Sequence, residues 1–313
     1  MAWSRERIAV AAYFAVLGVI CATWASSIDD MKLLLGLNAA QQGWLLFSGP
    51  MGSLVSLLCA SAIVTRLGSR RSLIMAVAAY ILVAFGLAAC FFWRAPIPCW
   101  CAAIALLACV GTVFNISVNT QGGIVERKAG CTIMNSFHAM FSLLSLIGGL
   151  LALFAAAMHV PVAYRFFGVL ALSAVAHIVF FSWLPKENDI AKKEKGTGFR
   201  RPDAALFFIG VAALVIMGCE GSINGWVNVF YRETLAAPDS RVKWGFCAVC
   251  AMMTFGRLVT DRFVNRFGGA RILRVYCVFV TVGLALALTS PFTDIMGTIL
   301  FQAIPGLRRG IVL

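Results

Sequence analysis

Charged residues are scarce in this sequence. Asp, Glu, Lys and Arg make up 12% of its 313 residues, hydrophobic residues make up 61%, and the mean hydropathy is +0.90. A soluble domain carries about 25% charged residues, so this apolar surplus cannot be buried in one globular core. Disorder is excluded too, because low hydropathy and dense charge are what keep a chain unfolded. The composition therefore all but excludes a water-soluble enzyme.

Catalytic motifs are also missing. The chain has no GxSxG nucleophile elbow, no GxxxxGK[ST] phosphate loop and no HExxH metal pair. The pair Cys247 and Cys250 has CxxC spacing, but no second pair or histidine cluster accompanies it, and a zinc site needs four ligands. We expect a protein that is not an enzyme, has no catalytic residue, and binds no metal and no cofactor. The absence of a phosphate-binding loop also excludes ATP-driven transport.

The apolar residues are gathered into stretches of about twenty, enough for a helix to cross a hydrocarbon core of about 30 Å. Because the core offers no water to the backbone amides, such stretches must be helical. The sequence therefore predicts an all-α membrane protein in a lipid bilayer, with nine spans and a tenth beginning near Ile295. The nine are Ile8–Ser26, Gly43–Val64, Ser72–Phe92, Pro98–Asn119, Ser136–His159, Phe166–Leu184, Ala204–Tyr231, Lys243–Val264 and Ile272–Ser290.

The net charge is +13, and the Lys and Arg residues are distributed unevenly between the two predicted faces of the membrane. With a cytoplasmic N-terminus, 17 Lys and Arg residues fall on the inner face and 6 on the outer face. This asymmetry is what the positive-inside rule produces. The basic charge therefore indicates a multi-pass protein of the cytoplasmic (inner) membrane with its N-terminus in the cytoplasm, and no nucleic-acid partner.

A repeat with an offset of 200 residues links the two parts of the chain. Four residues of the first part recur in register in the second, namely Trp44 with Trp244, Arg66 with Arg266, Gly68 with Gly268 and Arg71 with Arg271. The longest polar run separates the copies. We predict an N-terminal six-helix half (1–184), a cytoplasmic linker (185–203) and an incomplete C-terminal half (204–313).

The repeated loop carries a family resemblance. The segments VTRLGSRR (Val64–Arg71) and GRLVTDRFVNRFG (Gly256–Gly268) resemble the inner-loop signature of the major facilitator superfamily. Three further stretches resemble its YbjJ/MosC-like branch: WASSIDDMKLLLGLNAAQQGW, VNTQGGIVERKAGCTIMNSFHAMFSLLSLIGG and EGSINGW. The resemblance implies two six-helix halves and transport of small solutes by alternating access. The chain departs from the signature at Thr65 and Asn265, where the family usually has aspartate, and at Ser27 and Asp29, where this branch more often has Arg and Pro.

The length does not fit two equal halves. A second copy beginning at residue 204 would end at about residue 390–400, whereas the sequence ends at Leu313. In the segment after Ser290, a short apolar run is followed by Pro305, Arg308 and Arg309. We expect a C-terminally truncated carrier that lacks about two and a half helices.

Polar residues inside spans are candidate binding residues, because burying them without partners is expensive. Glu220, Asn224 and Asn228 follow one another at four-residue spacing and share one face of span seven. We expect this face to bind substrate or an ion, with Glu220 as the candidate for proton coupling. A structural hydrogen bond between helices is the alternative.

A second polar group lies on spans four and five. Asn115 and Asn119 end span four, and His138, Ser142 and Ser145 form a stripe on span five. Amides and hydroxyls suit a neutral polar solute such as a sugar or polyol, and His138 can titrate near neutral pH. A helix-packing or gating network is an equal alternative for this group.

The inner loops are predicted to gate the carrier. Arg257 and Asp261 are four residues apart at the inner end of span eight and can pair with each other. We assign a gating role, not substrate binding, to the inner-loop residues Arg66, Gly68, Arg71, Arg257, Asp261, Arg262, Arg266, Gly268 and Arg271.

The predicted function is secondary active transport of a small solute by alternating access, with proton coupling. Two alternatives stay open at this point. One is a non-transporting truncated remnant of such a carrier. The other is a ten-helix drug/metabolite-type transporter, which suits about 300 residues but whose halves repeat at about 150 rather than 200 residues.

Overall fold

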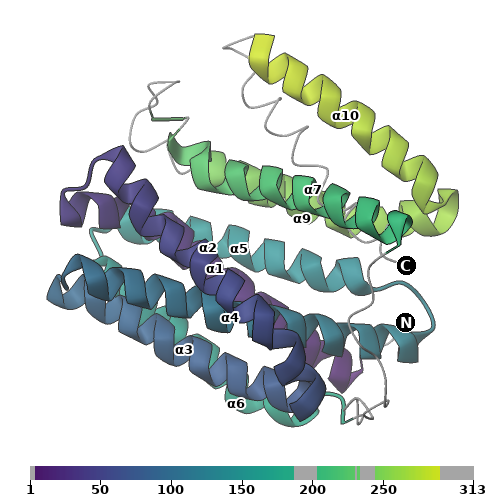
Figure 1. The fold of residues 1–313 in the computed structure, drawn as a ribbon, viewed down its shortest axis with the longest axis horizontal. Helices are drawn as coiled ribbons and strands as arrows, with labels where there is room; N and C mark the ends of the chain where they lie inside the picture. The colour runs from purple at the N-terminus through teal and green to yellow at the C-terminus, as the bar shows by residue number, and fades with distance from the viewer. Residues whose placement is uncertain (1–3, 187–202, 230, 233–243, 290–313) are drawn as a thin grey trace. The chain divides into compact units, whose positions relative to one another are not determined.

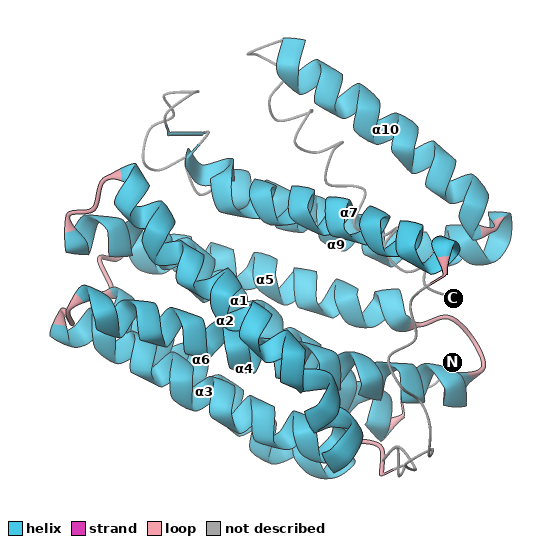
Figure 2. Cartoon of the chain, viewed as in Figure 1, coloured by secondary structure: helices cyan, strands magenta, loops and turns pink. Residues whose placement is uncertain are grey.

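A computed structural model describes residues 4–186, 203–229, 231–232 and 244–289. Within these ranges the chain forms helices and short connections, and no strand (Figures 1 and 2). The helices are α1 (Arg5–Leu35), α2 (Ala39–Leu67), α3 (Ser69–Trp93), α4 (Ile97–Ala129), α5 (Met134–Ala157), α6 (Val162–Phe180), the 3-10 helix η1 (Phe181–Trp183), α7 (Ala204–Val229), α9 (Trp244–Phe267) and α10 (Gly269–Thr289).

Seven of these helices, α1 to α7, are long and apolar enough to cross a membrane. Each of the nine predicted spans overlaps a helix, and the all-α membrane fold is confirmed. The mean hydropathy of α9 is lowered by charged side chains such as Arg257, Arg262 and Arg266. The tenth span, expected near Ile295, lies outside the described residues.

The first helix is longer than its predicted span. The span was expected to end at Ser26, but α1 continues to Leu35. Ser4 caps its start by accepting a hydrogen bond from the Arg7 amide at 3.2 Å. No proline or glycine interrupts the residues after Ser26, so the helix ends only at Gly36, which adopts the left-handed conformation with φ 62°.

By packing, the described helices fall into two compact units. The first comprises residues 1–131 and 151–192, and the second comprises residues 132–150 and 193–313. Helix α5 is therefore shared between them, with its larger part in the second unit. The predicted division into halves around the linker 185–203 stays a prediction.

The first unit is held together by close helix contacts. Helix α3 packs against α4 and α6, and α2 packs along α4 (Figure 1). Tyr13 is buried and meets the ring of Phe114 edge to face, with 6.5 Å between the centroids. Gly52 brings α2 against the backbone of α4 at Ala105, where a Cβ atom would lie 2.7 Å from the carbonyl carbon.

The second unit is built around α9. Helix α9 contacts both α7 and α10, and Thr260 of α9 shares a hydrogen bond with the Tyr276 hydroxyl of α10 at 3.0 Å. At the other end of α9, a Cβ atom on Gly245 would lie 2.9 Å from the side chains of Val227 and Tyr231. The absence of a side chain at Gly245 therefore lets α9 approach α7 closely.

Candidate functional site

Two oppositely charged side chains face each other inside the second unit. Arg257 lies in the middle of α9 and Glu220 lies in the second half of α7. The Nη2 atom of Arg257 is 3.8 Å from Oε1 of Glu220. Their side chains are 5% and 16% exposed, respectively. The pair therefore joins α7 to α9 at a place largely shielded from solvent.

Helix α5 completes the surroundings of Arg257. The Nη1 atom of Arg257 donates a hydrogen bond to the Ser142 hydroxyl and another to the His138 carbonyl oxygen, the latter at 3.2 Å. These residues belong to the part of α5 that packs in the second unit. The guanidinium therefore contacts a charged acceptor on α7 and two neutral acceptors on α5.

The acceptors around Arg257 offset the cost of placing its positive charge inside a membrane protein. A lone arginine at the centre of a membrane helix costs about 2.5–3.5 kcal/mol on insertion scales, so such residues face carboxylates, carbonyls or water. Arg257 has a carboxylate, a hydroxyl and a carbonyl oxygen as acceptors.

Helix α5 also meets α9 away from the hydrogen bonds of Arg257. A Cβ atom on Gly149 of α5 would lie 3.4 Å from the ring of Phe246 and 3.5 Å from the sulfur of Cys247. These are ordinary van der Waals distances, and Arg257 lies about three turns further along α9 than this contact.

The contact between Arg257 and Glu220 was not anticipated from the sequence, which suggested Asp261 as the partner of Arg257. The side chain of Asp261 lies outside the described part of the chain, so that pairing stays a prediction. The sequence did contain an indication of the observed contact. Arg257 and Glu220 each interrupt an apolar span, and charged residues inside membrane spans usually pair with an opposite charge.

The other predicted binding residues fall in different places. The side chains of Asn224 and Asn228 lie outside the described residues. In the first unit, Nδ2 of Asn119 donates to the carbonyl oxygen of Asn115 at 2.7 Å and to its Oδ1 at 2.8 Å. His138 belongs to the second unit, where its carbonyl oxygen holds Arg257. Substrate contact by these residues stays a prediction.

The two predicted inner loops share one backbone geometry. Gly68 and Gly268 both have φ 82°, and each donates its amide to the carbonyl oxygen four residues earlier, at 2.9 Å. Each glycine also accepts a hydrogen bond from the amide four residues later, at 3.1 Å from Ser72 and 3.3 Å from Ile272. The sequence repeat at 200 residues is thus also a repeat of turn structure.

The charged residues around these turns are largely exposed. Arg66 lies in the last turn of α2 and Arg71 in the first turn of α3. Arg266 and Arg271 border the second turn, and Arg262 lies about one turn earlier in α9. The Arg266 guanidinium lies over the ring of Phe267, 5.2 Å from its centroid. Exposed cations of this kind suit a solvated inner face, and their gating role stays a prediction.

Comparison with known proteins decides the family. The family model of the Major Facilitator Superfamily matches residues 6–312. The chain belongs to the major facilitator superfamily. An uncharacterised transporter of Sinorhizobium fredii is 28% identical over 279 residues, which cover 88% of this chain and 72% of that protein.

Two more relatives agree with this assignment. An uncharacterised MFS-type transporter of Yersinia pestis is 25% identical over 303 residues, covering 94% of this chain and 76% of the relative. The membrane protein MosC of Rhizobium meliloti is 23% identical over 285 residues, covering 90% of this chain and 68% of MosC. The resemblance to the MosC-like branch is confirmed.

Solved structures support the same fold. A crystal structure of the nucleoside transporter NupG, as a D323A mutant, matches with a TM-score of 0.69 and 12% identity, covering 96% of this chain and 80% of NupG. A second NupG structure matches with a TM-score of 0.59 and 13% identity, covering 96% of this chain and 79% of NupG.

Membership in the major facilitator superfamily makes this a membrane transport protein of the secondary type and, at the family level, not an enzyme. It also overturns one alternative. The ten-helix drug/metabolite-type transporter is wrong, because the family match runs through both copies of the repeat. The physical reason is the spacing of the two glycine turns, which are 200 residues apart rather than about 150.

Proposed function

We propose that this chain carries a small polar solute across the cytoplasmic membrane by alternating access, with its N-terminus in the cytoplasm, and that Glu220 couples this movement to protons. The observation that carries the proposal is the shielded ion pair between Glu220 and Arg257. Family membership supports the transport role, and the ion pair supplies an exchangeable charge inside the helical unit.

The ion pair supports coupling because its two states hold the helices differently. With Glu220 ionised, Arg257 is bound to both α7 and α5. Protonation of Glu220 removes the attraction between α7 and α9 but leaves the hydrogen bonds to Ser142 and to the His138 carbonyl oxygen. Helix α7 is then released while α9 stays attached to α5, which is a two-state element that a proton can bias.

The proposed solute is neutral and polar, such as a sugar or polyol. Asn224 and Asn228 follow Glu220 on one face of α7, and Asn115 and Asn119 supply amides on α4. Amide groups recognise hydroxyl-bearing solutes by donating and accepting hydrogen bonds. NupG is related by fold alone, so nucleosides are one more class to be screened.

The inner loops are proposed to latch one conformation. Arg66, Gly68 and Arg71 form one copy of the loop, and the other contains Asp261, Arg262, Arg266, Gly268 and Arg271. The positive φ of both glycines supports this role, because it turns the chain sharply between adjacent helices. Such a turn keeps the loop cations at the membrane surface. There they can form ion pairs with carboxylates in one conformation of the carrier and not in the other.

The test is uptake into proteoliposomes. A thermal-shift screen of the purified protein against sugars, polyols, amino acids, nucleosides and drugs first identifies a solute that raises Tm. Uptake of that solute is then measured with and without an inward proton gradient for wild type and Glu220→Gln. We expect the gradient to stimulate the wild type and to have no effect on the variant.

The matched control is Arg274→Gln, which alters an exposed residue of α10 outside the site and is expected to keep the stimulation. If Glu220→Gln keeps the full response to the gradient, the assignment of Glu220 to coupling is wrong. If the wild type is stably inserted but moves none of the solutes in either direction, the non-transporting remnant is favoured instead.

A further inference from the structure

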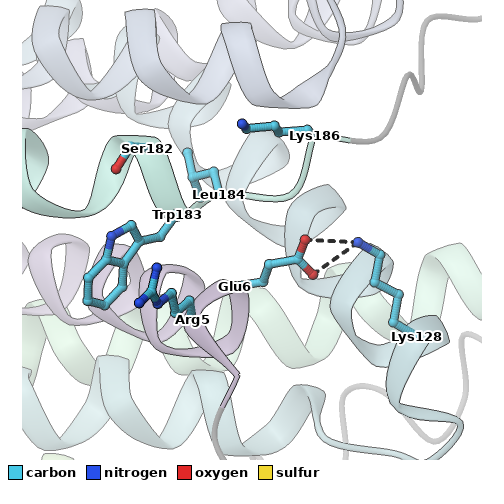
Figure 3. A pocket seen from close by; sticks show the side chains of 7 residues that line it. All are labelled: Arg5, Glu6, Lys128, Ser182, Trp183, Leu184 and Lys186. Atoms are coloured by element: carbon cyan, nitrogen blue, oxygen red, sulfur yellow. Dashed lines mark hydrogen bonds and ion pairs between the residues drawn. The ribbon is translucent and has the colours of Figure 1, made fainter.

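A cavity of about 420 Å³ opens in the first unit (Figure 3). It lies where α1 begins, where α4 ends, and where η1 follows α6. This volume is within the range of about 300–1,000 Å³ that is usual for small-molecule sites. Seven residues line it, namely Arg5, Glu6, Lys128, Ser182, Trp183, Leu184 and Lys186.

The cavity carries an excess of positive charge. Lys128 donates hydrogen bonds to both carboxylate oxygens of Glu6, at 2.9 and 3.0 Å, so these two charges neutralise each other. Arg5 and Lys186 provide two more cations, and among the described residues neither forms an ion pair with a carboxylate. An anion that enters the cavity therefore meets two exposed positive charges.

The walls are fixed by contacts outside the cavity. Arg70 of α3 donates a hydrogen bond to the Phe181 carbonyl oxygen at 3.3 Å, which holds η1 in place. Leu184 is 1% exposed and anchors the chain after η1. The Arg5 guanidinium lies over the ring of Trp183, 5.7 Å from its centroid. These contacts place the Arg5 guanidinium and the Trp183 ring together at the wall of the cavity.

The place of the cavity indicates the kind of anion. Three membrane helices begin or end there, so it lies at the level where lipid headgroups are found. Tryptophan favours this level, and basic pockets between membrane helices bind anionic headgroups. Serine adds a hydroxyl donor at Ser182.

We propose that this cavity binds a phosphate-bearing anion, supplied by the headgroup of an anionic phospholipid such as phosphatidylglycerol. Arg5 and Lys186 contact the phosphate, Ser182 donates to it, and the Trp183 ring packs against the glycerol carbons. This proposal does not rest on the role of Glu220.

The test uses native mass spectrometry of the full-length chain in neutral detergent. Equal amounts of phosphatidylglycerol and phosphatidylcholine are added, and the retained adducts are counted. Each basic residue near an anionic surface is worth about fivefold in affinity, so two cations predict a preference for phosphatidylglycerol of about 30-fold. We expect Arg5→Gln with Lys186→Gln to lose this preference.

Two control variants separate the cavity from general charge. Arg94→Gln with Arg274→Gln removes the same net charge from exposed residues that do not line the cavity, and it keeps the preference. Arg5→Lys with Lys186→Arg conserves the charge and also keeps it. If both double Gln variants lose the preference equally, or if neither does, the proposed site is wrong.

A second arm identifies the source of the phosphate. Phosphatidylglycerol, glycerol 1-phosphate and inorganic phosphate are each added to lipid-free protein, and Tm is measured. If only phosphatidylglycerol raises Tm, the ligand is a lipid headgroup. If glycerol 1-phosphate raises Tm in wild type and not in the cavity variant, the cavity binds the proposed anion from a soluble source. If no phosphate compound gives an effect that depends on Arg5 and Lys186, the proposal is refuted.

Discussion

Removal of the Arg257 charge is expected to destabilise the second unit. In Arg257→Gln the Glu220 carboxylate, whose side chain is only 16% exposed, loses the cation 3.8 Å away. Removing one partner of a buried ion pair costs about 3–5 kcal/mol, because the remaining charge stays shielded from water after its counter-charge is lost. The substitution also removes the donors to Ser142 and to the His138 carbonyl oxygen. We therefore expect the free energy of unfolding to fall by about 3–5 kcal/mol.

The opposite substitution is expected to cost less. In Glu220→Gln the Arg257 guanidinium keeps both acceptors on α5, so the loss is that of one charged contact, about 1.5–3 kcal/mol. In the double variant, which combines Arg257→Gln with Glu220→Gln, both charges of the pair are removed. Its loss should therefore be smaller than the sum of the two single losses, by about 0.5–3 kcal/mol.

The measurement is a double-mutant cycle of equilibrium unfolding in detergent micelles, followed by circular dichroism. Arg274→Gln is the matched control, since the same substitution at an exposed arginine of α10 should change stability by no more than about 0.5 kcal/mol. The reasoning is refuted if Arg257→Gln unfolds like this control, or if the losses of the single variants add up in the double variant.

Two glycine substitutions test the packing and the turns. Gly52→Ala should lower the free energy of unfolding by about 1–3 kcal/mol, because its Cβ would lie 2.7 Å from the Ala105 carbonyl carbon, whereas Gly86→Ala meets nothing within 4 Å and should leave stability unchanged or slightly raised. Equal effects at both positions would contradict the close approach of α2 and α4. Gly68→Ala should cost about 1–3 kcal/mol, because φ 82° with ψ 149° is a region that only glycine adopts readily. Gly36, at φ 62° and ψ 32°, lies in the left-handed helical region, so Gly36→Ala should cost less in the same assay.

Both the helices and the two matching turns were predictable from the sequence, for local reasons. An apolar run of about twenty residues has no alternative to a helix inside a bilayer. Gly68 and Gly268 stand at equal places in the repeat, and each reverses the chain between two helices. Helix ends were harder to predict, because the apolar run that predicts a span stops at the membrane surface. Helix α1 continues beyond Ser26 until Gly36 ends it.

The partners inside the helical units could not be predicted in the same way. Spacing along α9 indicates only which residues share a face, and it suggested Asp261 for Arg257. The acceptors observed for Arg257 come from α7 and α5, which lie far away along the chain. Which helices meet depends on where small residues such as Gly52 and Gly245 allow close approach, and on how each face is shaped.

The sequence by itself determined that this protein is helical, that it belongs in a membrane, and where its repeated turns lie, because each of these follows from local composition and from the bilayer as solvent. Only the tertiary structure decided that Glu220 and Arg257 form an ion pair, and that Arg5 and Lys186 line one cavity. Contacts between distant segments are chosen by packing, and no spacing along the chain encodes them.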